Sequence, residues 1–164
     1  MTNSALLPGE HPGIENAIAH RDDIVKAAWA SAIFEDQQIT ASYRMTAAQR
    51  EFLTDLGWNA ALPSVDQPWE DLRDNLREWI DSQALSVQLR SAWYAQGTEL
   101  EPDEFRIVLS VGGPNLTLEG ELDRYGSPCT ACLRYSWYSK SEVLPVIESE
   151  AEALVWFAQQ FVQA

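Results

Sequence analysis

Residues 104–123 read Glu104-Phe-Arg-Ile-Val-Leu-Ser-Val-Gly-Gly-Pro-Asn-Leu-Thr-Leu-Glu-Gly-Glu-Leu-Asp123, two alternating segments on either side of a Gly-Gly-Pro sequence. Alternation of apolar and polar residues with a period of two is typical of strands that bury one face. A four-residue turn at 112–115 places Phe105 opposite Leu122, and both apolar faces then lie on the same side. The stretch therefore predicts an antiparallel hairpin with one buried face.

Two further strands flank this hairpin in the sequence. Alternation predicts a strand at 85–93 before it, whose apolar residues are Leu85, Val87, Leu89 and Trp93. A second alternating segment at 130–138 has Leu133, Tyr135 and Trp137 on one face. The expected strands are 85–93, 104–111, 115–123 and 130–138.

Helical periodicity marks four other segments. Apolar residues recur at helical spacing over about 14–35, 46–56, 68–81 and 149–163. Thr46 is a typical N-cap residue, and Ser149 with Glu152 has the spacing of a capping box. The order of elements predicts an α+β fold: helices in the N-terminal half, a four-stranded antiparallel β-meander and a C-terminal helix packed on the sheet. Residues 1–13 are expected to be a loose leader, and 14–164 a single domain.

The net charge limits the classes of partner. The chain has 11 Lys and Arg against 25 Asp and Glu, a formal net charge of −14. Nucleic-acid-binding proteins neutralise phosphates with basic groups, so we do not expect this chain to bind nucleic acid directly. An anionic membrane surface repels such a chain as well, and no segment has the apolar length of a membrane span.

The cysteine content and the start of the chain indicate the compartment. Cys129 and Cys132 are the two cysteines of the sequence, too few for a disulfide scaffold, and residues 1–8 lack the basic and apolar regions of a secretory signal. We therefore expect a cytoplasmic protein. In a strand, residues three apart face opposite sides, so the two cysteines are expected to be structural.

Catalytic motifs do not emerge from the sequence. His20-Arg21-Asp22 resembles a kinase tripeptide without its partner motifs, and Gly112-Gly113-Pro114 lies between strands and not before a helix. No metal-ligand spacing accompanies Cys129 and Cys132. The sequence predicts no catalytic residues, no metal and no cofactor, and the expectation is a protein that is not an enzyme.

The acidic residues form stripes. Glu119, Glu121 and Asp123 share the polar face of the second hairpin strand, with about 6.8 Å between neighbours, equal to two 3.4 Å steps of a DNA strand. A second stripe follows the helix expected at 68–81, and its members are Glu70, Asp74, Glu78 and Asp81. Ordinary pairing is the alternative explanation: Arg106 falls opposite Glu121 in the expected register, and Arg134 is within reach of Glu119 or Thr117.

Four segments are similar to a known family. They are Ser86-Val-Gln-Leu-Arg-Ser-Ala-Trp93, Glu104-Phe-Arg-Ile-Val-Leu-Ser-Val-Gly-Gly-Pro114, Gly120-Glu-Leu-Asp-Arg-Tyr-Gly-Ser-Pro128 and Ala153-Leu-Val-Trp-Phe-Ala-Gln-Gln-Phe161. Over about residues 84–162 the chain resembles small uncharacterised accessory proteins of proteobacterial phages, plasmids and integrative elements. The resemblance implies a mobile-element protein and supplies no catalytic residues. The part before it, residues 1–83, matches no family that we can place.

Charge and resemblance together give a functional hypothesis. Phages and plasmids encode proteins that inhibit host defence, and an acidic surface can occupy the basic DNA-binding surface of a restriction enzyme or CRISPR effector. We expect such an inhibitor, a DNA mimic whose two acidic stripes contact the partner. The alternative is a non-catalytic interaction module, such as a toxin-immunity partner or a small scaffold of the element, and a homodimer is left open.

Overall fold

The computed structural model describes residues 12–36, 45–59, 61–62, 66–99 and 101–162. Within them it has four helices and a five-stranded antiparallel sheet, which confirms the α+β class. The helices are α1 (Pro12–Asp36), α2 (Ala47–Asp55), α3 (Trp69–Gln83) and α4 (Glu148–Gln159). The strands are β1 (Ser86–Arg90), β2 (Glu104–Ser110), β3 (Asn115–Glu121), β4 (Cys132–Trp137) and β5 (Lys140–Val143). Residues 1–11 of the expected leader lie outside the described residues, and its last two, Pro12 and Gly13, belong to α1, so the boundary at 13 was wrong.

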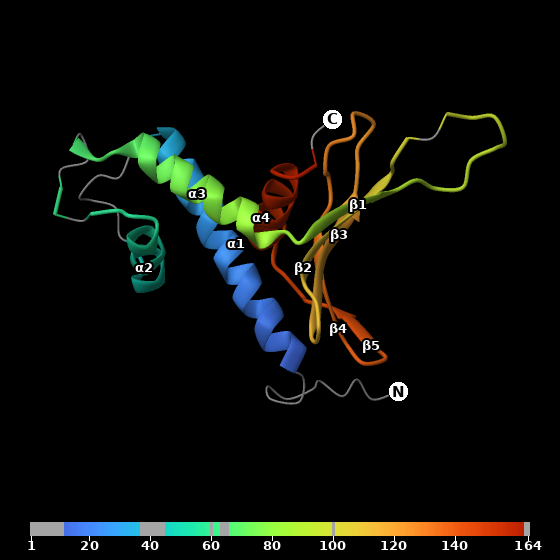
Figure 1. Ribbon diagram of the computed structural model, residues 1–164, viewed down its shortest axis with the longest axis horizontal. Helices are drawn as coiled ribbons and strands as arrows, with labels where there is room; N and C mark the ends of the chain where they lie inside the picture. Colours follow the sequence, from blue (N-terminus) through green and yellow to red (C-terminus); the bar gives the residue numbers. More distant parts are fainter. Residues whose placement is uncertain (1–11, 37–44, 60, 63–65, 100, 163–164) are drawn as a thin grey trace.

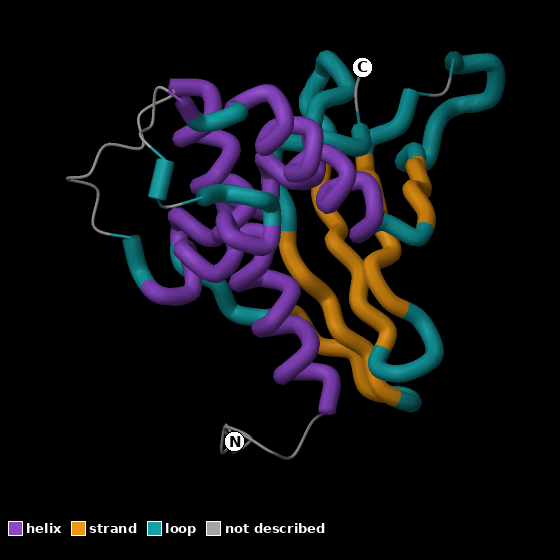
Figure 2. The backbone as a smooth tube through the Cα atoms, turned by 60° about the vertical axis from the view of Figure 1, so that its left-hand side comes forward, coloured by secondary structure: helices purple, strands orange, loops and turns teal. Residues whose placement is uncertain are grey.

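The helices α1, α3 and α4 lie on one side of the sheet, so the fold has a helical layer and a sheet layer (Figure 1 and Figure 2). α1 connects the two layers because it contacts α3, α4 and β4. Ala17, Ala27 and Ala30 of α1 are fully buried, and such small side chains allow neighbouring elements to approach closely. The other face of the sheet is left without a covering layer among the described residues.

The β2–β3 hairpin has the expected faces in a different register. Phe105 lies opposite Gly120, not opposite Leu122, so the predicted pairing was wrong by two residues. A Cβ atom at position 120 would lie 2.8 Å from the Phe105 ring, which explains why a glycine occupies this position. Because the shift is an even number, the apolar residues of both strands still face the helices.

The strand β5 was missing from the predicted meander, which therefore had four strands where the sheet has five. It pairs antiparallel with β4, with Trp137 opposite Lys140. The two residues between them make the turn, and Tyr138 adopts a positive φ of 53° there. Tyr135 donates a hydrogen bond from its hydroxyl to Glu142 Oε2 at 2.9 Å, which ties β5 to β4.

The helix ends follow local hydrogen bonding. Thr46 and Gln49 form a reciprocal capping box at the start of α2, with Gln49 N donating to Thr46 Oγ1 at 3.1 Å and Thr46 N donating to Gln49 Oε1 at 2.8 Å. The cap predicted at Ser149 was wrong. α4 begins at Glu148, and its first turn is closed by the Ile147 N–H, which donates to Glu150 at 2.9 Å.

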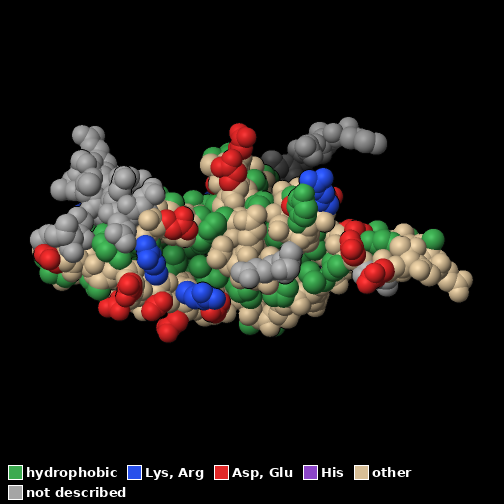
Figure 3. All heavy atoms as spheres, turned by 90° about the horizontal axis from the view of Figure 1, so that it is seen from above, with side chains coloured by type: hydrophobic (Ala, Val, Ile, Leu, Met, Phe, Trp, Pro, Cys, Tyr) green, Lys and Arg blue, Asp and Glu red, His purple; other side chains and the backbone are tan. Residues whose placement is uncertain are grey.

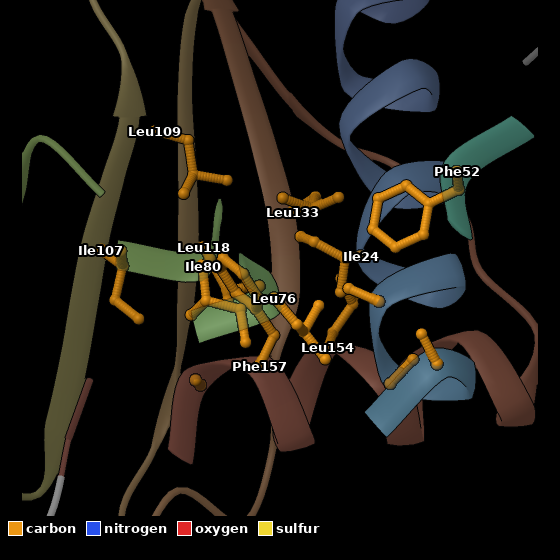
Figure 4. Close-up of a cluster of buried hydrophobic side chains, with 14 of the residues drawn as sticks. Ile24, Phe52, Leu76, Ile80, Ile107, Leu109, Leu118, Leu133, Leu154 and Phe157 are labelled. Carbon is orange, nitrogen blue, oxygen red and sulfur yellow. The ribbon is translucent and has the colours of Figure 1, made fainter. Parts of the chain in front are cut away.

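The core lies between the sheet and the helices (Figure 4). Leucine and isoleucine side chains from β2, β3 and β4 meet apolar side chains of α1, α3 and α4 there. Phe157 of α4 is fully buried and makes edge-on contacts with the rings of Trp79 and Phe161. This core holds α3 within the helical layer, and the side of α3 opposite the core faces solvent.

Candidate functional site

The solvent side of α3 carries five carboxylates, and we call them the α3 acidic face: Glu70, Asp71, Asp74, Glu78 and Asp81. All five are exposed. The buried residues of the helix, Leu72, Leu76 and Ile80, lie on its opposite side. At 100° per residue, the five acids occupy an arc of about 100° centred opposite the buried stripe. Four of them were predicted from spacing. The fifth, Asp71, was missed although it precedes Asp74 by three residues, because the predicted row started from its neighbour Glu70.

Two arginines border the α3 acidic face without lying within it. Arg73 Nη2 donates a 2.7 Å hydrogen bond to the backbone oxygen of Phe34 near the end of α1, so this guanidinium holds two helices together. Arg77 lines a hollow of about 220 Å³ between α1, α3 and α4, which Trp156 also lines. In Figure 3, acidic side chains gather along the helical part of the surface with basic side chains beside them. None of the ion pairs found among the described residues involves an acid of this face.

The acidic stripe expected on β3 is largely engaged within the protein. The Glu119 carboxylate accepts hydrogen bonds from Arg106 Nε at 2.8 Å, Arg134 Nε at 3.0 Å and Thr117 Oγ1 at 3.0 Å. Burial by itself raises the pKa of the Glu119 carboxyl, but the hydrogen bonds from Arg134, Thr117 and Arg106 outweigh it and hold the pKa below its usual value. The expected pairing of Arg106 with Glu121 was wrong because of the register shift.

We predict that Glu119→Gln lowers the free energy of unfolding at pH 7 by about 1 kcal/mol, since two arginines lose their charged partner. The pKa of Glu119 is lower in the folded state than in the unfolded state. The stabilisation is therefore present above the unfolded pKa of about 4.3 and disappears as the pH falls through the folded pKa. Urea unfolding of both proteins at pH 7 and at pH 3 measures this difference.

Glu121→Gln is the matched control for that experiment. Glu121 lies on the same face of β3, is exposed, and stands opposite another acid, Glu104. Its neutralisation is expected to leave stability unchanged or slightly higher, because like charges on opposite residues destabilise a strand pair. Equal losses in the two variants at pH 7 would contradict the role given to Glu119.

The third member of the β3 stripe, Asp123, has a local structural role. Its Oδ1 accepts hydrogen bonds from the backbone N–H of Tyr125 at 2.8 Å and of Ser127 at 3.0 Å, which closes the turn after β3. Glu119 and Glu121 point away from the helical layer, since their neighbour Leu118 faces it. The two predicted acidic stripes therefore lie on different sides of the molecule, and the structure does not bring them together.

The outer face of the sheet forms a shallow trough of about 660 Å³. Its charged lining residues come from four strands and are Arg90, Glu104, Arg106, Glu119, Glu121 and Arg134. Arg90 forms an ion pair with Glu104, and Arg106 and Arg134 both pair with Glu119. Three positive and three negative groups cancel, so this face offers neither an acidic nor a basic field to a partner.

The remaining motifs have structural explanations. Cys129 and Cys132 are free thiols, and burial raises the pKa of the Cys132 thiol, which disfavours the reactive thiolate. His20 is half-buried in α1, and desolvation lowers its pKa although Asp23 acts in the opposite direction. Gly112 and Gly113 have positive φ angles of 93° and 90° in the β2–β3 turn. Within the described residues no group of three or more His, Cys, Asp and Glu side chains is arranged to hold a metal ion.

Comparisons of the chain with protein-family models, with curated proteins and with solved structures give no match. Among the described helices, none combines the length and the hydrophobicity needed to cross a bilayer. Within the predicted partner-binding residues, the four on α3 remain available to a partner. In the acidic stripe of β3, Glu119 and Asp123 have carboxylates engaged within the described part of the protein, whereas the exposed Glu121 carboxylate is in none of the ion pairs found there.

Proposed function

We propose that this protein inhibits a host defence system, such as a restriction enzyme or a CRISPR effector, by binding its basic DNA-binding surface. The α3 acidic face is the contact surface, and the protein acts as a steric block and DNA mimic, without catalysis. The observation that carries the proposal is the set of five exposed carboxylates on one side of α3. In line with the resemblance in residues 84–162, we propose a cytoplasmic accessory protein of a phage, plasmid or integrative element.

The spacing of these carboxylates supports mimicry of a phosphate backbone. Glu70, Asp74 and Glu78 follow one another at four-residue intervals. Four residues of an α-helix rise about 6 Å, close to the 6.8 Å of two steps along a DNA strand. A row of negative charges at this spacing matches the basic groups with which a DNA-binding protein contacts successive phosphates.

Charge alone increases the association rate more than the affinity, so an apolar anchor is also needed. The hollow beside α3 supplies one candidate, because it is lined by the half-buried Trp156 next to Arg77. Three other aromatic residues lie on the sheet side of the molecule, away from α3. Tyr125 and Tyr138 are exposed at the sheet, and Trp137 is half-buried and packs against Tyr138.

The test is to capture partners from cells that carry active restriction and CRISPR systems. The tagged full-length protein is incubated with lysate at about 0.05 M salt and at about 1 M salt, where charges are screened beyond about 3 Å. We expect a basic nucleic-acid-binding complex at low salt that high salt and added duplex DNA both release. Recovery of a partner that ignores both salt and DNA contradicts mimicry and favours an apolar interface.

The capture also separates the alternative functions. A toxin encoded beside this gene, recovered in place of a defence complex, indicates an immunity partner. Recovery of other proteins of the mobile element indicates a scaffold. Either result contradicts the proposed role as an inhibitor of host defence. The proposal is also contradicted if a defence complex saturated with the protein keeps its activity.

A further inference from the structure

The strand β1 is an open edge of the sheet with an uncovered apolar stripe. Within the described residues it pairs with β2 alone, so alternate backbone N–H and C=O groups on its other side are unpaired. Leu85, Val87 and Leu89 are 58%, 42% and 54% exposed on the side that faces the helical layer. The sequence predicted a strand at 85–93, and the structure has one that is shorter, Ser86–Arg90. Its apolar side is exposed because α3 and α4 do not extend over β1.

This edge lacks the devices that usually keep sheet edges apart. Proline, bulges and inward-pointing charges protect most edges, and β1 has the sequence Ser-Val-Gln-Leu-Arg with its one charge, Arg90, paired to Glu104. Residues 82–98 contain no acid, although the chain carries a net charge of −14. A contact of β1 with β1 therefore brings no carboxylate of residues 82–98 of one copy against those of the other.

We propose that a second copy of this chain occupies the edge, with the two β1 strands paired antiparallel about a two-fold axis at Gln88. Val87 then lies opposite the partner's Leu89, and the reverse pair forms by symmetry. Arg90 lies opposite the partner's Ser86, which keeps the two arginines apart. The two five-stranded sheets become one sheet of ten strands, and each edge satisfies the hydrogen bonds of the other.

The segment after β1 extends the same interface. Residues 91–99 and 101–103 project beyond the sheet as an arm (Figure 1), and Trp93 on it is fully exposed. The arm is held in shape because Tyr94 donates from its hydroxyl to Glu101 O at 2.8 Å and Asp103 Oδ1 at 3.1 Å. In the proposed register Trp93 lies beyond the partner's Leu85 along the strand. The apolar stripe of one copy therefore faces the same stripe of the other copy.

The available area is sufficient for a stable pair. Trp93 together with the half-exposed Leu85, Val87 and Leu89 offers on the order of 400 Å² of apolar surface per copy. If about three-fifths of an interface is apolar, two copies bury roughly 1,300 Å² in total, within the range of standard interfaces. An unrelated protein that only added one strand to the β1 edge would leave most of this apolar stripe exposed to solvent.

Sedimentation of the full-length protein tests the proposal. At concentrations on the order of 100 µM, where a micromolar dissociation constant leaves most chains paired, we expect twice the 18.4 kDa chain mass. Val87→Glu should shift the protein to the monomer because the new charge enters an apolar contact twice by symmetry. The matched control is Val143→Glu on the opposite edge strand, β5, where the valine is equally exposed at 42%; this variant should stay dimeric.

A wild-type mass of one chain at that concentration overturns the proposal. Loss of the dimer in Val143→Glu but not in Val87→Glu also overturns it, since another edge would then be responsible. Trp93→Ala changes a fully exposed side chain and serves as a second variant should Val87→Glu fail to fold; it is expected to raise the dissociation constant at least 10-fold. An unchanged dissociation constant in this variant excludes the arm from the interface.

The register has its own test in a Cys129→Ser background. Gln88→Cys places two thiols on the two-fold axis, so mild oxidation should join the chains covalently. Ser86→Cys is the control, because residue 86 lies opposite the partner's Arg90 and the two introduced thiols are not adjacent. Efficient cross-linking of Ser86→Cys in place of Gln88→Cys contradicts the register. The β1 edge and the α3 acidic face are distinct surfaces, so a monomer that still inhibits its target separates this inference from the proposed function.

Discussion

Gly120→Ala is expected to lower the free energy of unfolding by about 3 kcal/mol or more, which for a chain of this size shifts the melting temperature down by about 6–12 °C. The added Cβ atom would lie 1.9 Å from the backbone oxygen of Thr130 and 2.8 Å from Cε1 of Phe105. Neither atom is the flexible end of a side chain, so the backbone of the sheet has to move. Thermal unfolding monitored by circular dichroism measures the effect.

Several hydrogen bonds hold the segment after β3 close to Gly120, so this segment cannot move away from an added Cβ atom. Cys129 N donates to Glu121 O at 3.0 Å, and Glu121 N donates to Thr130 Oγ1 at 3.0 Å. Gln159 of α4 donates from Nε2 to Pro128 O at 3.1 Å and fixes the same loop from the other side. A shift of the Thr130 carbonyl therefore breaks hydrogen bonds in the sheet and towards α4 together.

Gly13→Ala is the matched control for this substitution. Its Cβ atom would lie 3.1 Å from Pro114 Cβ and 3.1 Å from Tyr135 Cδ2, so a displacement of only a few tenths of an ångström is needed. We expect a loss below about 1 kcal/mol. A melting temperature for Gly120→Ala as high as that of Gly13→Ala would contradict the close approach of Thr130 to β3.

The same glycine shows how far the sequence predicts this fold. Alternation in residues 104–123 predicted both strands and their inward faces, because the period of two follows from strand geometry alone. The register depends on contacts that alternation does not encode: the fit of the Phe105 ring over Gly120 and the hydrogen bond from Ser110 Oγ to Pro114 O at 2.9 Å in the turn. The prediction was therefore right about faces and wrong about partners.

The strand β5 could not be predicted for a related reason. Lys140-Ser-Glu-Val143 has one apolar residue and no alternation. Its turn uses Tyr138 at a positive φ, where Asn or Gly is the usual signal. By contrast, the helix α3 could be predicted because Leu72, Leu76 and Ile80 recur at helical spacing, and the structure confirms that all three are buried.

For the candidate site, the sequence predicted which acids share a face but not which ones are neutralised. The α3 stripe follows directly from helical spacing, and its members are exposed. On β3 the alternative explanation, a pair of Arg134 with Glu119, is confirmed, whereas Arg106 was expected at Glu121; both guanidinium groups converge on Glu119 from neighbouring strands. That convergence depends on register and on a third strand, which no local pattern specifies.

Neutralising four of the five carboxylates of the α3 acidic face is expected to reduce the rate of association with a basic partner by at least about 10-fold at low salt. The variant combines Glu70→Gln, Asp74→Asn, Glu78→Gln and Asp81→Asn. It removes four negative charges and leaves the side-chain shapes nearly unchanged. Binding kinetics over a range of salt concentrations measure the effect, and the salt dependence should become weaker along with the rate.

The stability of this variant should stay within about 1 kcal/mol of the wild type. Removing like charges at four-residue spacing relieves a few tenths of a kcal/mol for each pair, while the loss of Glu70 in the first turn removes a favourable interaction with the helix dipole. These two effects oppose each other. A reduced association rate in a protein of normal stability therefore reports on the surface and not on folding.

The control variant removes four exposed acids from four different segments: Glu15→Gln, Glu51→Gln, Glu99→Gln and Glu152→Gln. It has the same net charge as the α3 variant, so a general effect of charge on association is equal in both. If the acids of α3 form the contact surface, the α3 variant loses inhibition of the defence system at concentrations where the control still inhibits. Equal inhibition by the two variants shows that the position of the carboxylates does not matter, and this outcome removes α3 from the proposed function.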